Sequence, residues 1–328
     1  MSVPALLVYL EHVDGELDEA SAQTLTFARR LQGQVTDCCL AGFAAGEGAA
    51  ALAAAVGAQG ATTLHVAEHD ALGAYAPRAL AGALHQLVER EAPVAVVGPG
   101  TERGNEVLAH LAAFAGLPLA ANCVQAELDE PARVTRVRWG GSLLEEALLH
   151  APLKLLTVQP HTVAAEPAGT QEAAVERFTP ALSEADTAVR VVERVSTSTG
   201  GVSLAEAKVV VTGGRGVGSA EGFAVIEELA SLLGGAVGCS RAVTSAGWRP
   251  HTDQVGQTGT KIAPDLYIAC GVSGATQHMA GCKGAKAILA VNTDGEASIL
   301  AGADYAVIGD LHEVVPAISA ELRKARGA

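Results

Sequence analysis

A chain of 328 residues, with 49% hydrophobic and 18% charged residues, predicts two soluble globular domains that each bury a core. The formal net charge of −14 argues against nucleic acid or an anionic membrane as the main partner, and no apolar stretch is long enough to span a membrane. The six cysteines lack zinc-ligand spacing, so neither a metal site nor a disulfide framework is predicted.

The first 158 residues alternate short apolar runs with amphipathic stretches. The predicted strands are Ala5–Leu10, Val35–Ala41, Thr62–Val66 and Val94–Gly98, and the predicted helices are Asp18–Leu31, Gly48–Val56, Pro77–Arg90 and Gly104–Ala115. This order is typical of a mostly parallel sheet with helices on both faces. The first apolar run has no basic segment before it, which favours a strand over a signal peptide and predicts a cytoplasmic location.

After Asn122 the pattern changes, because strand-like runs follow one another without long helices between them. These runs are Cys123–Leu128, Arg133–Trp139 and Leu153–Val158, and we expect them to extend the sheet in antiparallel fashion. The stretch 162–188 shows no sustained periodicity, and one more strand is predicted at Ala188–Val195. The polar segment Ser196–Gly201 then predicts a linker, which divides the chain into domains 1–200 and 201–328.

The second domain resumes the alternation of strands and helices. Its predicted strands are Lys208–Val211, Gly235–Gly238, Leu266–Cys270, Ala287–Val291 and Ala306–Ile308, and its helices are Ser219–Leu233, one from about Ala275, and Leu311–Arg323. Polar residues follow these strands where each one ends: Arg215, Ser240, Arg241, Ser273, Asn292 and Asp310. In an open parallel sheet these ends line one crevice, which is where such folds bind ligands. Neighbouring glycines allow close approach of an anionic, planar ligand.

The two commonest nucleotide motifs are absent from this region. Gly214-x-Gly216 would need a third glycine at position 219 for the dinucleotide fingerprint, and that position is Ser219. A phosphate-binding loop starting at Gly213 would need a lysine at the same position. Any phosphate is therefore expected in a different glycine-rich arrangement.

Longer motifs resemble the α subunit of electron transfer flavoproteins. They are Val211-Thr-Gly-Gly-Arg-Gly, Cys239-Ser-Arg241, Gln254-Val-Gly-Gln-Thr-Gly259, Leu266-Tyr-Ile-Ala-Cys-Gly-Val-Ser-Gly-Ala-Thr-Gln-His278 and Ala290-Val-Asn292. Their order and spacing match that family, and the first half matches it more loosely at Gly98–Gly104 and Arg136–Gly140. The resemblance implies two three-layer αβα domains with mostly parallel sheets. The C-terminal one would be a Rossmann-like FAD-binding domain without the GxGxxG fingerprint.

The resemblance also implies which residues hold FAD. Arg241 would lie over the flavin ring, Thr258 would bond toward N5, and His278 would reach the N1/C2-carbonyl side. A guanidinium and a histidine that can be protonated would both stabilise negative charge on the reduced ring. The full expected set is Arg215, Ser240, Arg241, Val255, Gly256, Gln257, Thr258, Ser273, Gly274, Ala275, Thr276, Gln277, His278, Asn292, Asp310 and Leu311. Within it, Arg215, Ser240, Ser273 and Gln277 would serve the pyrophosphate and ribityl chain, and Asn292 and Asp310 the adenosine.

The family's function implies an electron carrier rather than a substrate-converting enzyme. Such a chain pairs with a β subunit that carries AMP or a second FAD. The pair takes electrons from flavin dehydrogenases, such as the acyl-CoA dehydrogenases of fatty acid β-oxidation, and passes them to a quinone oxidoreductase or another acceptor. A bifurcating or nitrogen-fixation-associated α subunit is one alternative, and a stand-alone flavin or nicotinamide oxidoreductase is another. A third is a nucleotide-binding interaction module without a redox role.

Plainer interpretations apply to several of these residues. Asp310 immediately precedes a predicted helix and is suited to cap it, which is compatible with ligand contact. Thr258 alone would be an ordinary turn residue, and its role rests on the resemblance. In the first domain Glu11, His12 and Asp14 form no pattern typical of a catalytic pair, so a structural, partner-docking domain is predicted there.

Overall fold

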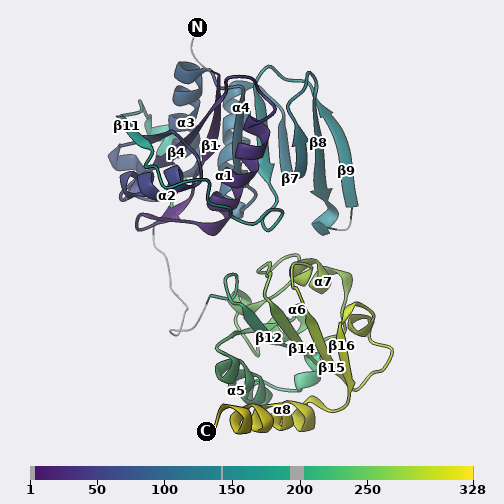
Figure 1. The fold of residues 1–328 in the computed structure, drawn as a ribbon. Coiled ribbons are helices and arrows are strands. Elements are labelled where there is room, and N and C mark those ends of the chain that lie inside the picture. Colours follow the sequence, from purple (N-terminus) through teal and green to yellow (C-terminus); the bar gives the residue numbers. More distant parts are fainter. Residues whose placement is uncertain (1–3, 142, 193–202, 328) are drawn as a thin grey trace. The chain divides into compact units, whose positions relative to one another are not determined.

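The structure is a computed structural model of the chain, and it describes residues 4–141, 143–192 and 203–327 (Figure 1). The chain forms two compact units, Met1–Arg194 and Val195–Ala328. Both are α/β with largely parallel sheets, which confirms the predicted fold class. The predicted linker Ser196–Gly201 lies outside the described residues. In the described ranges, no helix combines the length and apolar character that crossing a membrane requires.

The first unit is built on a nine-stranded sheet. Its order is β11 (Ala174–Phe178), β5 (Thr63–Ala67), β4 (Cys39–Ala45), β1 (Ala5–Tyr9), β6 (Ala95–Pro99), β10 (Lys154–Val158), β7 (Leu119–Glu127), β8 (Ala132–Arg138) and β9 (Leu143–Leu149). Only β8 runs against its neighbours among these strands. A two-stranded hairpin, β2 (His12–Val13) and β3 (Glu16–Leu17), follows the first strand.

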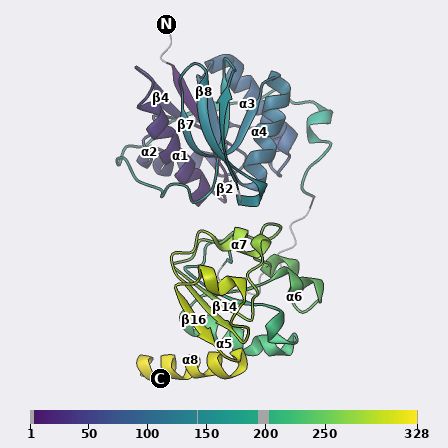
Figure 2. The same ribbon diagram turned by 90° about the vertical axis from the view of Figure 1, so that its right-hand side faces the viewer.

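Helices cover both faces of this sheet (Figure 2). One face packs against α1 (Glu19–Gln32) and α2 (Ala53–Ala58), and the other against α3 (Pro77–Glu91) and α4 (Glu102–Ala115). The N-termini of α1 and α4 are capped by side chains. Asp18 Oδ1 accepts a hydrogen bond from Ala20 N at 2.8 Å, and Thr101 Oγ1 accepts one from Gly104 N at 2.9 Å.

Three predictions for this unit were wrong. The strand expected at Val35–Ala41 lies four residues later, because backbone bonds from Gln34 N to Leu31 O and from Val35 N to Gln32 O prolong the turn after α1. Strand β10 is not antiparallel: it inserts between β6 and β7 and is parallel to both. The segment 188–192 forms no strand, and the rest of the strand predicted at Ala188–Val195 lies outside the described residues.

Two strands had no clear signal in the sequence. Strand β11 is exposed along most of its length, so it lacks an apolar face; it is held by pairing with β5 and by Phe178, which packs against Phe43. Strand β9 is also an edge strand with mostly exposed residues, and it pairs with β8 from Leu143 to Leu149. Pairing with a neighbouring strand, rather than burial, stabilises both elements.

The second unit contains one five-stranded, fully parallel sheet. Its order is β13 (Ala236–Cys239), β12 (Val209–Gly213), β14 (Leu266–Cys270), β15 (Ile288–Asn292) and β16 (Tyr305–Ile308). Helices α5 (Ala224–Leu233), α6 (Arg241–Ser245) and α8 (Leu311–Arg326) contribute to the core on one face, and α7 (Thr276–Cys282) to the core on the other. The helix predicted from Ser219 begins later, because two 3-10 turns at Arg215–Val217 and Glu221–Phe223 precede it.

Candidate functional site

The carboxyl edge of the second sheet contains a topological switch point. From β12 the chain passes to β13 on one side and later to β14 on the other, so the loops that follow β12 and β14 diverge at this edge. Ligands of open α/β sheets bind in the crevice that such divergence opens. As predicted, polar residues lie at the strand ends on this edge: Arg215, Ser240, Ser273 and Asp310 follow strands, and Asn292 is the last residue of β15.

The loops after β12 and β14 pack backbone against backbone. Gly214 N donates to Cys270 O at 2.8 Å, and Gly216 N donates to Gly271 O at 3.1 Å. A Cβ added to Gly214 would lie 2.2 Å from Gly271 O, and Gly271 itself has φ +64°. Only glycine fits this contact, so the two loops form one closely packed backbone surface at this edge.

Two arginines at this edge have guanidinium groups without a partner in the described structure. Arg215 follows β12 and Arg241 begins α6, and both side chains are exposed. Neither guanidinium group forms a hydrogen bond or ion pair with residues 4–141, 143–192 or 203–327. In a chain with a net charge of −14, where carboxylates are abundant, two such arginines favour an external anion.

Ser240 lies beneath Arg241 and is buried. Its backbone N–H donates to Gly213 O at 3.0 Å, which joins the end of β13 to the end of β12. Its Oγ is buried without a hydrogen-bond partner among the described residues. Because unpaired buried hydroxyls are costly, this atom is suited to a ligand that supplies the missing bond.

The loop that carries Thr258 is held by a glutamine. Gln254 is buried, accepts from Thr244 Oγ1 at 2.7 Å, and donates from Nε2 to Thr258 Oγ1 at 3.0 Å. The loop is tied to α7 by Gln257 N, which donates to Gln277 O at 2.7 Å. Thr258 Oγ1 therefore accepts one bond inside the protein and keeps its own hydrogen for a ligand. Gln254 was not among the predicted site residues, since nothing in the sequence shows this contact.

His278 is only 7% exposed, on α7. Its Nε2 lies 2.6 Å from the hydroxyl oxygen of Tyr267, and its Nδ1 is buried without a partner among the described residues. Burial lowers the pKa of His278 to about 4; the backbone of Val255 opposes this shift without forming a hydrogen bond to Nδ1. The expectation that His278 can be protonated was therefore wrong for neutral pH, because its surroundings exclude the water that would stabilise the charge.

The residues expected near the adenosine organise their own loops. Asn292 donates from Nδ2 to Val272 O at 2.9 Å and accepts from Asp294 N at 3.0 Å, so it ties the loops after β14 and β15 together. Asp310 caps α8 by accepting from His312 N at 2.9 Å. The predicted capping role of Asp310 is thus confirmed.

The remaining predicted residues lie in the same loops. Ser273, Ala275, Thr276 and Gln277 are exposed, and Gly274 packs against Ile299, where a Cβ would meet the backbone nitrogen at 2.2 Å. The side chains of Val255 and Leu311 are buried in hydrophobic cores, and Gly256 is buried against the backbone of α7. Only their backbone atoms are placed to contact a ligand.

The first unit has a crevice of its own beside β1 and β4, with a volume of about 380 Å³. Three of its lining residues have partners: Glu11 accepts a hydrogen bond from Thr101 Oγ1 at 2.5 Å, Tyr75 donates to Glu106 at 2.7 Å, and Arg103 stacks on the Tyr75 ring. Burial raises the pKa of Glu11. The lining carries three carboxylates, Glu11, Asp14 and Glu47, and one arginine, Arg103, so its charge suits an anionic ligand less well than the edge of the second sheet does.

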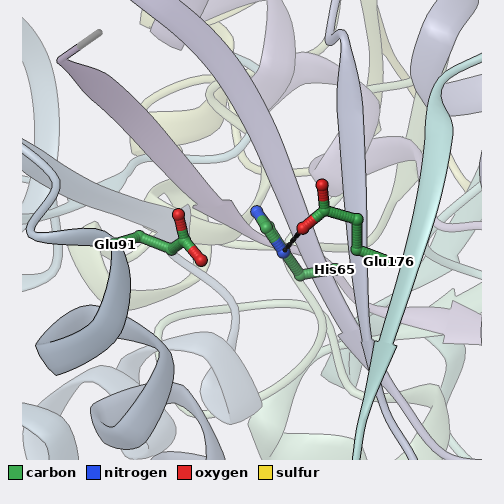
Figure 3. A group of neighbouring side chains, drawn as sticks. All are labelled: His65, Glu91 and Glu176. Carbon is green, nitrogen blue, oxygen red and sulfur yellow. Dashed lines mark ion pairs between the residues drawn. The ribbon is translucent and has the colours of Figure 1, made fainter. Parts of the chain in front are cut away.

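One cluster in the first unit has the composition of a metal site. His65, Glu91 and Glu176 lie with their ligand atoms within 4.8 Å of one another, and His65 Nδ1 is 3.3 Å from Glu176 (Figure 3). Arg90 bonds to Glu91 at 2.7 Å and lies 3.5 Å from His65 Nδ1. A guanidinium thus already balances these carboxylates, and we assign no metal to them.

Comparisons with known proteins agree with this geometry. Residues 6–183 match the electron transfer flavoprotein domain, and residues 203–283 match the electron transfer flavoprotein FAD-binding domain. The chain belongs to the electron transfer flavoprotein α-subunit family. It is 37% identical to the electron transfer flavoprotein subunit alpha of Mycobacterium leprae (strain TN), over 98% of this chain and 99% of the relative. It is 34% identical to that of Bacillus subtilis (strain 168), over 97% of each.

The cofactor of this α subunit is FAD, and the carboxyl edge of the second sheet suits it. FAD carries an anionic pyrophosphate and a ring that gains negative charge on reduction, and the unpaired guanidinium groups of Arg215 and Arg241 suit such charge. It also carries hydroxyl and carbonyl groups, which can complete the bonds missing at Ser240 Oγ and His278 Nδ1. The matched FAD-binding domain contains these residues, and the first crevice lies outside it.

Proposed function

We propose that this α subunit holds FAD along the carboxyl edge of its second sheet and works in a heterodimer with a β subunit. The heterodimer accepts electrons from flavin dehydrogenases such as acyl-CoA dehydrogenases and delivers them to a quinone oxidoreductase or another acceptor. The observation that carries the proposal is that two arginines with unpaired guanidinium groups and two unpaired buried polar atoms all lie in the segments that follow β12, β13 and β14. We further propose a cytoplasmic location, where the six free cysteines remain reduced.

FAD supplies the one-electron redox chemistry, and the protein sets its energetics. We place Arg241 beside the flavin ring, where a guanidinium that is always charged stabilises negative charge gained on reduction. Thr258, oriented by Gln254, donates its remaining hydrogen toward the ring. Arg215, Ser240, Ser273 and Gln277 serve the pyrophosphate and ribityl chain, and Asn292 and Asp310 the adenosine side.

The first unit is proposed as the docking domain for the β subunit. Strands β8 and β9 extend the sheet beyond its helices (Figure 1). On β9, Leu144 is 69% exposed and Leu148 lies on the same strand face, while Leu149 on the opposite face joins the core beneath α1. Trp139, 80% exposed, follows β8. An uncovered apolar edge of this kind suits a permanent protein partner.

The test is the absorption spectrum of the chain co-purified with its β subunit. One FAD per heterodimer supports the proposed carrier, whereas two FADs favour the bifurcating alternative. A colourless complex that takes up no added FAD would contradict the proposal. Turnover of a substrate with NADH by the isolated chain would favour a stand-alone oxidoreductase instead.

A further inference from the structure

Tyr267 lies at the centre of the second unit, between the sheet and α7. Its side chain is fully buried, on β14, and its ring lies 6.2 Å from the ring of His278, centroid to centroid. The hydroxyl oxygen is 2.6 Å from His278 Nε2, which is a short hydrogen bond. Burial raises the pKa of Tyr267 well above 10, so the phenol keeps its hydrogen.

This bond has two possible directions. If Tyr267 donates to Nε2, the single ring hydrogen of a neutral histidine is on Nδ1. If Nε2–H donates to Tyr267, the phenol hydrogen needs another acceptor. Thr212 is close enough to lower the pKa of Tyr267 by hydrogen bonding, but Thr212 Oγ1 does not reach hydrogen-bond geometry with any described residue, so it is a poor acceptor for this hydrogen. The first direction pairs the phenol hydrogen, and the second leaves it unpaired in the core.

The surroundings of Nδ1 favour the same direction. This nitrogen is buried and unpaired among the described residues, and the Val255 backbone raises the pKa of the ring, as a neighbouring carbonyl does when it favours an N–H group. His278 follows the loop Ser273–Gln277, which belongs to the carboxyl edge of the sheet. A hydrogen on Nδ1 would thus be a buried donor that forms no hydrogen bond with the described residues.

We propose that Tyr267 is a positioning residue that fixes His278 as the Nδ1–H tautomer, so that a neutral histidine donates a hydrogen bond to FAD. The inference rests on the proposed function for its ligand, while the tautomer itself is a property of the chain alone. A neutral donor differs from a protonated one because its interaction with the cofactor does not change with pH across the neutral range.

The direct test is ¹⁵N NMR of the full chain with ¹⁵N-labelled histidine, since the shift of each ring nitrogen reports whether it bears a hydrogen. The chain has ten histidines, and the signals that vanish in His278→Gln identify His278. We expect a hydrogen-bearing Nδ1 and a bare Nε2 at neutral pH, with or without FAD. A hydrogen on Nε2 in the wild-type chain would overturn the inference, and this measurement needs no folded Tyr267 variant.

The second test is Tyr267→Phe, which keeps the ring and removes the hydroxyl. We expect the two His278 tautomers to mix and FAD affinity in the heterodimer to fall about fivefold, the size of one neutral hydrogen bond. The matched control is Tyr305→Phe, because Tyr305 is an exposed tyrosine of the same unit and should leave both unchanged. If Tyr267→Phe keeps one Nδ1–H tautomer, Tyr267 does not position His278. If the wild type binds no FAD at all, the proposed function fails independently of the tautomer.

Discussion

Charge and hydrogen bonding at the proposed flavin site come from different residues. Arg241 is exposed and permanently charged, while His278 is buried and neutral at physiological pH. The sequence suggested that both would stabilise negative charge on the reduced ring. The structure assigns the fixed charge to the arginines and leaves the histidine as a hydrogen-bonding group.

Replacing Arg241 should therefore change the redox potential. We expect Arg241→Ala to lower the potential of the first one-electron step by on the order of 60 mV, which corresponds to about tenfold in an equilibrium constant. Arg241→Lys should recover part of the loss, since it keeps the charge without the planar fork. Spectroelectrochemical titration of the heterodimer measures the potential of this first one-electron step for each variant. An unchanged potential with FAD still bound would show that Arg241 does not lie beside the flavin ring.

Burial of His278 predicts a pH-dependent stability. Its pKa is about 4 in the folded chain and near 6.5 when unfolded, so the unfolded chain binds more protons as pH falls. The contribution of His278 to the free energy of unfolding is fully present above about pH 6.5. It is lost progressively toward pH 4, by roughly 3 kcal/mol in total. Urea unfolding between pH 7 and 4.5 should show a shallower pH dependence for His278→Gln. Equal slopes for the two proteins would contradict the burial argument.

Sequence patterns could place residues at strand ends but could not show which side chains meet. Arg215, Ser240 and Asn292 were predictable at the carboxyl edge because each directly follows an apolar run. The bond from Gln254 to Thr258 and the pairing of Tyr267 with His278 were not predictable. Both depend on how loops and α7 fold back on the sheet, which is a tertiary property without periodicity of its own.

At the scale of elements, the loops after β12 and β14 act as one unit through glycine contacts. We expect Gly214→Ala to destabilise the second unit by about 1–3 kcal/mol and to weaken FAD binding, because the new Cβ would collide with Gly271 O. Gly295→Ala is the matched control, since a Cβ there meets no atom within 4 Å. Thermal unfolding and FAD titration measure both effects. Equal behaviour of the two variants would show that the loop contact is not needed.

Element prediction succeeded where burial imposes a pattern. Strand β14 was predicted with its observed bounds, Leu266–Cys270, because it is an apolar run that ends at glycine. Strand β11 was missed because it is mostly exposed, and β10 was placed in the wrong direction because parallel pairing between β6 and β7 depends on distant strands. Long-range pairing is the part of a sheet that local sequence does not encode.

At the scale of the whole molecule, two sheets of similar architecture have different proposed tasks. The first carries the uncovered edge of β8 and β9, and the second carries the FAD site. We expect Leu144→Glu to reduce recovery of the β subunit in co-purification at least tenfold, because it places a charge in an apolar contact. Val175→Glu, on the opposite edge strand β11, should leave recovery unchanged. Normal β-subunit recovery with Leu144→Glu would show that the docking surface does not include this edge of the sheet.

The central claim is that FAD binds at the carboxyl edge of the second sheet rather than in the crevice of the first. The decisive measurement is an equilibrium titration of FAD into two variant heterodimers. One carries both Arg215→Ala and Arg241→Ala, and the other carries Arg103→Ala alone. We expect the double variant to bind FAD a hundredfold or more weaker, at about 1.5–3 kcal/mol for each lost charged bond, and Arg103→Ala to bind like the wild type. Wild-type affinity in the double variant, together with loss of FAD in Arg103→Ala, would contradict this claim.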